Sequence, residues 1–246
     1  MKIKFYICFI ILLIIIIISC TIETTTPRAA ILVYHKILKN VSGDDNYARS
    51  IDDFESDLNY IKNKNYDIIT FRSLCRHIKN KIYLKNPSIV ITFDDDIPTN
   101  RAIRLLKKFK YKTTIFLKTE ISDESTWDDI IALNNYRTDD GKKLFYFESH
   151  THTHPRLSSI SDDEVLYQLE TSKETLETRL NTTVRYLALP FGDGAYNQKI
   201  IEIAKNVGYK GIRTIIYGYE DIMYSDLYSL KAIVMEKNSK INLVLM

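Results

Sequence analysis

The stretch "SIVITFDDD", residues 88–96, is an apolar run of strand-forming residues that leads directly into three aspartates. Such a run indicates an apolar β-strand. A helical segment follows from Pro98 to Lys108, and capping of that helix explains one carboxylate, Asp96. It does not explain Asp94 and Asp95 together, because adjacent unpaired charges repel each other unless a cation or a proton lies between them. A divalent metal at the end of this strand is the simplest solution.

Further apolar, β-rich segments occur on both sides of this stretch and alternate with helical patterns. The strand candidates are 30–34, 67–70, 88–93, 113–117, 144–148, 184–189, 209–213 and 228–235. Residues 51–61 repeat apolar side chains at spacings of three and four behind Ser50, which is placed to cap a helix. Residues 161–164 form a capping box before a second helix. About eight strands with helical crossovers predict an α/β fold, and favour a (β/α) barrel over an open sheet.

The ends of four strand candidates carry polar or turn-forming residues. These ends are His35, the pair Asp94 and Asp95, His150, and the turn Pro190-Phe191-Gly192. In (β/α) barrels the reactive residues gather at the C-terminal ends of the strands. The sequence therefore predicts one site that is built from all four ends.

The stretch "ESHTHTHPRL", residues 148–157, places three histidines at alternate positions. His150 and His154 can converge on one metal, and a single carboxylate completes a three-ligand site with an open position for water. His152, midway between them, would then have to point elsewhere. The alternative is an exposed histidine-rich loop with adventitious metal affinity, but that alternative leaves the aspartate pair unexplained.

Three motifs, in this order, resemble those of the polysaccharide deacetylases, the carbohydrate esterases with a NodB-homology domain. They are Thr92-Phe93-Asp94-Asp95, His150-Thr151-His152-Thr153-His154-Pro155 and Leu189-Pro190-Phe191-Gly192. The family patterns are T-F-D-D-G, H-[ST]-x-x-H-P and R-x-P-[YF]-G. The resemblance covers about residues 30–235 and implies a distorted (β/α) barrel of about seven strands. The chain is most similar to the branch that deacetylates poly-N-acetylglucosamine, because "ILVYHKI", residues 31–37, matches its N-terminal Y-H-x-I strand.

The resemblance implies a metal-dependent removal of N-acetyl groups from N-acetylglucosamine-containing glycans, either poly-N-acetylglucosamine or peptidoglycan. Asp95, His150 and His154 would bind the metal, most often Zn²⁺, with Co²⁺, Ni²⁺ or Fe²⁺ as alternatives. Asp94 would act as general base on a metal-bound water, and the hydroxide would attack the acetamide carbonyl.

Two further roles complete the mechanism that the resemblance implies. The metal and the backbone N–H of Phe191, within Pro190-Phe191-Gly192, would hold the oxyanion. His35 would protonate the departing amine, and acetate would be released. In other branches a histidine late in the chain does this work, but no histidine follows Pro155 here.

Three positions depart from the family pattern. Asp96 stands where the family has glycine, and we expect the turn to survive because aspartate tolerates left-handed backbone better than most residues. Ala188 stands where many members place the arginine that orients the catalytic aspartate. Ala232 occupies the place of a second, late arginine; Lys231 beside it is a candidate substitute, although lysine does not replace a bidentate arginine.

The N-terminus predicts an exported lipoprotein. Two lysines and an apolar run precede Ile17-Ile18-Ser19-Cys20, which resembles a bacterial lipobox. Residues 1–19 are then the signal peptide, 20–29 the lipidated Cys20 with a short tether, and 30–246 the catalytic domain. The chain would be held on a bacterial membrane, at the periplasmic face or the cell surface. An uncleaved N-terminal anchor is the alternative.

Charge and cysteine content exclude other classes of partner. The formal charge of the whole chain is +3, and loss of the two lysines in residues 1–19 leaves +1. A near-neutral surface gives no electrostatic footprint for nucleic acid, so we expect a neutral or mixed-charge partner, here an N-acetylated polysaccharide. Cys8 lies in the signal, Cys20 would be acylated and Cys75 stands alone, so no disulfide framework is available. Nothing in the sequence sets the oligomeric state.

Two competing functions remain to be weighed. The first is a surface lipoprotein that keeps the barrel as a glycan-binding module and has lost turnover; the joint presence of His35, Asp94, Asp95, His150 and His154 speaks against it. The second is a glycoside hydrolase that uses the aspartate pair. That function is disfavoured because neighbouring carboxylates are too close for either acid–base geometry, and the histidines would go unused.

Overall fold

A parallel β-sheet forms the centre of the molecule. The computed structural model describes residues 27–41, 43 and 45–245. The strands of the sheet are β1 (Ala29–Tyr34), β4 (Asp67–Ile68), β5 (Ser88–Asp95), β6 (Thr113–Leu117), β7 (Phe145–Ser149), β8 (Tyr186–Ala188), β9 (Gly211–Arg213) and β10 (Ile233–Val234). They pair in the order β10-β1-β5-β6-β7-β8-β9, with β4 beside the first residues of β5. The sheet curls into the predicted distorted barrel of about seven strands.

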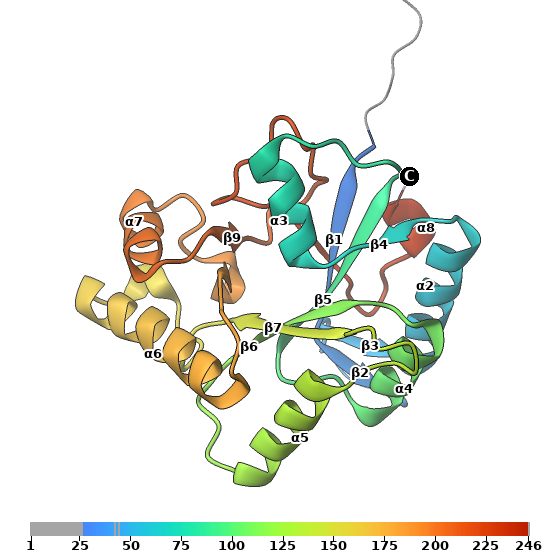
Figure 1. Ribbon diagram of the computed structural model, residues 1–246, viewed down its shortest axis with the longest axis horizontal. Helices are drawn as coiled ribbons and strands as arrows, with labels where there is room; N and C mark the ends of the chain where they lie inside the picture. The colour runs from blue at the N-terminus through green and yellow to red at the C-terminus, as the bar shows by residue number, and fades with distance from the viewer. Residues whose placement is uncertain (1–26, 42, 44, 246) are drawn as a thin grey trace, which may run out of the picture.

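Helices surround this sheet, as Figure 1 shows for α2, α4, α5, α6 and α7. The helices are α2 (Ile51–Asn63), α3 (Phe71–Asn80), α4 (Asn100–Phe109), α5 (Glu124–Asn135), α6 (Asp162–Leu180), α7 (Gln198–Val207) and α8 (Ile241–Val244), with 3₁₀ turns η1 (Leu157–Ser159) and η2 (Pro190–Gly192). Both predicted N-caps are present: Ser50 accepts from Asp53 N–H and Ser161 accepts from Glu164 N–H. These caps satisfy first-turn donors that would otherwise lack partners.

Side chains alternate between two cores, because successive strand residues point to opposite faces. The larger core lies between the sheet and the outer helices. The smaller core fills the inside of the barrel, where Ile31, Val33 and Val90 pack with Phe71 and Leu74 of α3. Helix α3 therefore covers the inner face of the barrel, and polar residues on that face can reach solvent only near the rims.

The last part of the chain is less regular than its sequence predicts. Of the strand candidate 228–235, only β10 belongs to the sheet, and Leu230 forms an isolated bridge to Arg213. This bridge joins the two ends of the strand order and nearly closes the barrel. A small parallel pair, β2 (Lys36–Leu38) and β3 (Ala48–Ser50), follows β1 and was not predicted.

The N-terminal signal peptide (residues 1–19) and Cys20 lie outside the described residues. Within the ranges that are described, no helix combines the length and apolarity needed to cross a bilayer.

Candidate metal centre and active-site cleft

All four predicted strand ends meet at one edge of the barrel, around a cleft of about 400 Å³. His35 follows β1, Asp94 and Asp95 end β5, His150 follows β7, and Phe191 lies in η2 after β8. The complete lining is His35, Lys36, Asp45, Tyr47, Asp94, Asp95, His150, His154, Leu189, Phe191, Ile215, Tyr217, Ala232, Val234 and Glu236. The parallel sheet explains this convergence, because carboxyl ends of parallel strands share one edge.

Asp95, His150 and His154 bring three ligand atoms together within 4.8 Å of one another. Asp95 Oδ1 lies 3.5 Å from His150 Nε2 and 3.2 Å from His154 Nε2. The two Nε2 atoms are 3.2 Å apart. One carboxylate and two imidazoles form a donor set that zinc and other first-row divalent ions bind.

The protonation of His150 fits a metal ligand. Its Nδ1 lies 2.9 Å from the carbonyl oxygen of Ala188, which can only accept, so the ring proton belongs on Nδ1. Burial lowers the pKa of His150 to about 4, although the carboxylates of Asp94 and Asp95 oppose this shift. The ring is therefore neutral at pH 7, and Nε2 carries a lone pair directed at its neighbours.

His154 is also neutral at pH 7, because burial lowers its pKa. With the His150 proton on Nδ1, the lone pair of its Nε2 lies beside the carboxylate of Asp95, and the two repel each other unless a cation or a proton lies between them. The residues present therefore fit a divalent metal, which Asp95, His150 and His154 would hold.

Helix α6 fixes the loop that carries both histidines. The buried side chain of Gln168 accepts hydrogen bonds from the backbone N–H groups of His152 and Thr153, at 3.1 and 2.8 Å. Within the loop, His154 N–H donates to Thr151 Oγ1 at 3.1 Å. These bonds hold His150 and His154 in place before any ligand arrives, so little ordering is left for binding to cost.

Left-handed backbone is concentrated around the cleft. Asp95 (φ 74°), Thr151 (φ 68°), His154 (φ 64°) and Phe191 (φ 57°) all adopt it. Non-glycine residues in this region cost free energy and persist where the surrounding structure holds them, often at functional sites. Asp96, which stands at the family glycine, is exposed and has no positive φ. The expected strain therefore falls on Asp95 and not on Asp96.

Asp94 is buried beside the metal triad and forms an ion pair with Arg213, the last residue of β9. Its Oδ2 accepts from Arg213 Nη2 and lies 3.8 Å from His150 Nε2 and 3.9 Å from His35 Nε2. Burial alone would raise the pKa of Asp94, but Arg213, His150 and His35 outweigh it and hold the pKa below its ordinary value. Oδ1 is also buried, and no atom among the described residues is bonded to it.

Arg213 was missed in the sequence analysis, and it answers the question raised by the two missing arginines. It lies directly beside Ala188 in the register of β8 and β9. Its guanidinium lies 5.2 Å from the ring centre of Phe116 and is fully buried. Because Ala188 and Ala232 are small, they leave the inner face open to this side chain. The available signal was an arginine inside the apolar segment "GIRTII", residues 211–216.

Lys231, the candidate substitute for the late arginine, does not pair with Asp94. Its backbone N–H bonds to the carboxylate of Glu220, and its side chain packs against Gly218. Among the described residues no ion pair joins Lys231 to Asp94.

His35 lies beside Asp94, with its Nε2 3.9 Å from Asp94 Oδ2. Its Nδ1 is buried and has no hydrogen-bond partner among the described residues. Its ring packs against Tyr47, with centres 5.1 Å apart. Asp94 and Tyr47 thus hold a titratable ring at the cleft wall.

In the turn Pro190-Phe191-Gly192, the first and last residues pack against the rest of the fold and the middle residue faces the cleft. Pro190 is buried and Gly192 (φ 65°) lies so close to Ile215 that an added Cβ would sit 2.4 Å from Ile215 Cγ1. Of the three residues only Phe191 lines the cleft. Its ring meets His154 edge-on, with centres 4.6 Å apart, and its N–H has no acceptor among the described residues.

Two aromatic residues, His152 and Trp127, lie outside the cleft. His152 Nδ1 is 3.0 Å from Thr119 Oγ1, and its ring faces Tyr167. Trp127 is 2% exposed and belongs to the outer core, where its Nε1 donates to Ile121 C=O.

Comparison with known proteins places these features in a family. The model of the family described as "Polysaccharide deacetylase" matches residues 81–212, more than half of the 246-residue chain. The chain is 27% identical over 148 residues to the poly-beta-1,6-N-acetyl-D-glucosamine N-deacetylase of Staphylococcus aureus (strain MSSA476), covering 59% of this chain and 50% of that protein. The chain thus spans about half the length of the curated relatives it matches.

Solved structures of similar shape cover most of the chain. The Streptococcus pyogenes deacetylase PplD, solved in complex with acetate, has a TM-score of 0.77 at 24% identity, covering 89% of this chain and 97% of that chain. A de-N-acetylase from Aggregatibacter actinomycetemcomitans has a TM-score of 0.72 at 16% identity, covering 89% and 100%. At these identities the likeness shows a shared fold. Since the matched segment spans more than half of the chain and includes both the aspartate and histidine motifs, the chain belongs to the polysaccharide deacetylase family.

Proposed function

We propose that this protein is a metal-dependent hydrolase that removes N-acetyl groups from N-acetylglucosamine-containing glycans and releases acetate. One observation carries the proposal: a buried, ionised Asp94 with one unbonded oxygen lies between a buried arginine and the Asp95-His150-His154 triad. A carboxylate kept as a base beside a cation site is what hydrolysis of an amide by water requires.

The triad would hold a divalent ion, with Zn²⁺ as the first choice. Bound there, the ion would supply Lewis acidity toward the acetamide carbonyl and would make a nearby water more acidic. The protein's own contribution is to keep His150 and His154 neutral and fixed in orientation.

Asp94 would accept the proton of the attacking water at Oδ1, the oxygen with no bonded partner. Arg213 would hold Oδ2 and so leave Oδ1 free to accept that proton. Arg213 also keeps Asp94 ionised, since its charge lowers the pKa of that carboxyl. A base that is already ionised near neutral pH is ready for each turnover.

His35 would donate a proton to the nitrogen of the leaving amine. Its Nε2 lies 3.9 Å from the same Asp94 oxygen that is 3.8 Å from His150 Nε2, so an acetamide bound at the triad would have His35 near its nitrogen. The N–H of Phe191, which has no acceptor among the described residues, would stabilise negative charge on the carbonyl oxygen.

The substrate class rests on the relatives and on the cleft walls. The curated relative named above acts, by its name, on poly-beta-1,6-N-acetyl-D-glucosamine. In this chain Tyr47, Phe191 and Tyr217 line the cleft and are about half exposed or more. Exposed aromatic faces suit the apolar faces of sugar rings. We propose poly-N-acetylglucosamine or peptidoglycan as the polymer.

The proposed location is the cell envelope, with the chain attached through a lipid on Cys20. The support is the sequence pattern of residues 1–20 alone. Mass spectrometry of the protein isolated from membranes tests it: we expect an N-terminal diacylglyceryl-cysteine at Cys20, and an intact Met1 would contradict it.

The decisive test of the activity is acetate release by the full-length chain in a nonionic detergent, loaded in turn with Zn²⁺, Co²⁺, Ni²⁺ and Fe²⁺. The substrates are β-1,6-linked N-acetylglucosamine oligomers, β-1,4-linked oligomers and peptidoglycan. We expect metal-dependent release that a chelator abolishes and that is lost in Asp94→Asn and His35→Ala. His152→Ala is the matched control on the same loop and should stay within about threefold of wild type, since a contact outside the cleft adds little to catalysis.

Two outcomes would change the assignment. Inactivity of the wild type with every metal and substrate, with glycan binding retained, would favour the glycan-binding module. Chelator-sensitive activity that His35→Ala leaves intact would remove His35 from the role of general acid.

A further inference from the structure

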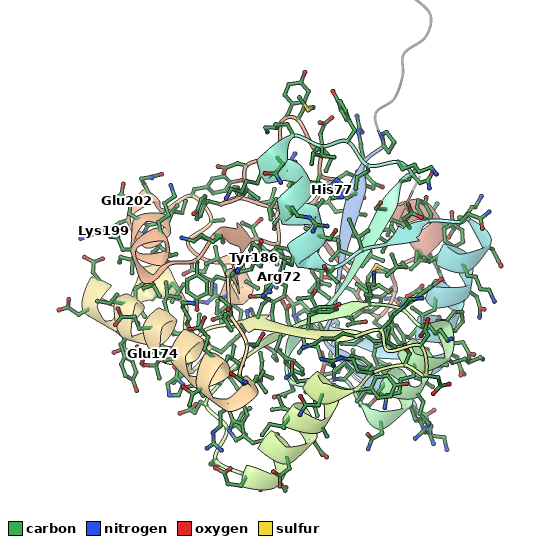
Figure 2. The ribbon with its side chains drawn as sticks, in the orientation of Figure 1. Arg72, His77, Glu174, Tyr186, Lys199 and Glu202 are labelled. Atoms are coloured by element: carbon green, nitrogen blue, oxygen red, sulfur yellow. The ribbon has the colours of Figure 1, made fainter. Side chains whose placement is uncertain are left out.

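A second pocket, of about 400 Å³, lies away from the cleft, at the edge of the sheet where β8 and β9 begin. Five cationic side chains line it. Arg72, Arg76 and Lys79 come from α3, Arg185 precedes β8, and Lys210 precedes β9. Figure 2 shows Arg72 and Tyr186 side by side near the centre of this face. The remaining lining is polar or apolar, and none of it is acidic: Thr70, Ser73, Cys75, Asn80, Tyr186 and Leu227.

The charges of this pocket are largely uncompensated. Arg76, Lys79, Arg185 and Lys210 are exposed, and none of them pairs with a carboxylate within the described part of the chain. Glu148, which is not part of the lining, accepts from Arg72 Nη2 at 3.0 Å. Four positive charges around one pocket repel each other, and a bound anion would reduce this electrostatic repulsion.

Arg72 is only partly used by its partners. Its Nη2 contacts Glu148 and the carbonyl oxygen of Thr183, but its Nε is buried with no acceptor among the described residues. A buried donor without an acceptor costs free energy. Burial raises the pKa of Glu148 above its ordinary value even though Arg72 opposes the shift.

The positive charge also affects the pKa of a neighbouring lysine. Lys143, just before β7, is half-buried, and its Nζ donates to Asn134 Oδ1 at 2.7 Å. Its pKa is lowered to about 8, first by burial and then by the charges of Arg137 and Arg72. The field therefore extends beyond the pocket wall.

We propose that this pocket, formed by Arg72, Arg76, Lys79, Arg185 and Lys210, binds a phosphate group. Phosphate offers several acceptor oxygens and up to two charges, and it suits guanidinium forks and lysine ammonium groups together. The floor of Tyr186 and Leu227 would accommodate the apolar part of a phosphate ester. Two sources share this chemistry: the headgroup of an anionic phospholipid and a soluble phosphate or phosphate ester.

The position of the pocket favours the lipid source. All strands of the sheet are parallel, so β1 begins at the same edge as β8 and β9. Eight residues lie between Cys20 and Ala29, the first residue of β1, and the nine residue steps between them span at most about 30 Å. If Cys20 is lipidated as proposed, the basic pocket lies on the side of the anchor and the catalytic cleft opens away from it.

Isothermal titration of the full-length chain in a nonionic detergent tests the proposal. The soluble probes are inorganic phosphate and glycerol 3-phosphate; the lipid probes are mixed micelles that contain phosphatidylglycerol or, as the uncharged comparison, phosphatidylcholine. We expect saturable binding of at least one phosphate probe, with phosphatidylglycerol well above phosphatidylcholine. Binding of the soluble probes alone would assign the site to free phosphate, and binding of phosphatidylglycerol alone to the lipid.

The variant Arg76→Glu with Lys210→Glu should weaken binding at least tenfold and leave acetate release unchanged. The control Arg101→Glu with Arg104→Glu makes the same change in net charge on the exposed face of α4, outside the pocket, and should leave binding within about twofold. If the glutamate pair misfolds by circular dichroism, Arg76→Gln with Lys210→Gln replaces it. Equal weakening by the pocket and control variants, or no binding of any phosphate probe, would overturn the proposal.

Discussion

Two buried carboxylates flank Phe116 inside the barrel, and they differ in what surrounds them. Asp94, Phe116 and Glu148 are neighbours in register on β5, β6 and β7. Each carboxylate pairs with one arginine, Arg213 for Asp94 and Arg72 for Glu148. Yet the pKa of Asp94 is lowered and that of Glu148 is raised.

The difference comes from what each carboxylate does with its second oxygen. Asp94 keeps Oδ1 unbonded, while its Oδ2 lies near two histidines and pairs with the fully buried Arg213. Glu148 uses Oε2 to accept two backbone N–H groups, from Arg185 and Tyr186, at 2.8 and 3.0 Å. Burial is the largest effect on both carboxyls, but only Asp94 has enough nearby positive charge to overcome it. We conclude that an ion pair alone does not mark a reactive group; an unused atom does.

The largest expected effect comes from neutralising each carboxylate in turn, which tests whether Asp94 and Glu148 differ in catalytic role. Asp94→Asn should lower kcat/KM by about 10³-fold, within the range that a general base contributes. Its melting temperature should fall as well, because asparagine leaves the buried guanidinium of Arg213 without its counter-charge. Glu148→Gln should leave kcat/KM within about threefold, because this side chain lies behind Arg72 and not in the cleft. Similar losses of activity in both variants, measured by acetate release, would show that the two carboxylates do not differ in role.

The next largest effect concerns the arginine beside Asp94. Arg213→Met removes the charge that lowers the pKa of Asp94, so that pKa should rise. Activity requires ionised Asp94, so the acidic limb of the kcat/KM profile should move to higher pH. At the pH optimum kcat/KM should fall by about 10²-fold, a loss comparable to that of one preorganised electrostatic contact. Arg213→Lys should restore part of kcat/KM and move the acidic limb part of the way back toward wild type. Arg179→Met, which removes an exposed pair with Glu124, is the matched control and should leave the profile unmoved.

The two carboxylates should also affect the pH dependence of the free energy of unfolding in different ways. The folded pKa of Glu148 is raised above its ordinary 4.5, so the folded state binds more protons than the unfolded state between 4.5 and that raised value. Stability contributed by this group is therefore present below pH 4.5 and is lost as pH rises through the folded pKa. Glu148→Gln should remove this decline in urea titrations.

Truncation of the same side chain should cost stability at every pH. Glu148→Ala leaves the N–H groups of Arg185 and Tyr186 without their acceptor, which costs about 1–3 kcal/mol for each buried group left unpaired. For Asp94 the pH sign is opposite: its lowered pKa contributes stability above its ordinary 3.8, which is lost as pH falls through the folded value. Because the lowered pKa values of His150 and His154 make stability rise over part of the same pH range, the wild type is compared with Glu148→Gln. A stability difference between the two proteins that does not change from pH 4.5 to 7 would contradict the assignment for Glu148.

The smallest effect is expected at Asp96. Because this exposed residue has no positive φ, glycine there relieves no strain and only adds freedom to the unfolded chain. Asp96→Gly should destabilise the fold by about 0.5–1 kcal/mol in urea titrations. Metal affinity should stay within a few fold. A clear stabilisation would show that the aspartate is strained after all.

The sequence was sufficient to predict which residues meet at the cleft. Asp94 with Asp95, and His150 with His154, are close along the chain, and parallel strands carry such ends to one edge regardless of the details of packing. The predicted strands and the N-caps Ser50 and Ser161 follow from local patterns in the same way. Whether these side chains have the proposed roles stays a prediction.

What could not be predicted depends on register. Arg213 reaches Asp94 from 119 positions away because β8 and β9 align it beside the small Ala188. No local pattern encodes that alignment. The long candidate 228–235 failed for a related reason: its apolar residues favour a strand, but only a bridge at Leu230 and the two residues of β10 find partners.

The basic pocket was hidden for another reason. Its cations come from one helix and from two separate loops, so they form no charge run in the sequence. A near-neutral total charge conceals such a patch, since composition reports sums and not positions.

The burial of the only tryptophan has a spectroscopic consequence. Trp127 lies 2% exposed in α5, with the guanidinium of Arg179 5.3 Å from its ring centre, and lines neither the cleft nor the basic pocket. Emission excited at wavelengths that spare tyrosine therefore reports the packing of α5 against the sheet, and it should stay constant when a ligand binds at either pocket. A fluorophore of this kind makes unfolding visible without a label, while the two pockets remain optically silent.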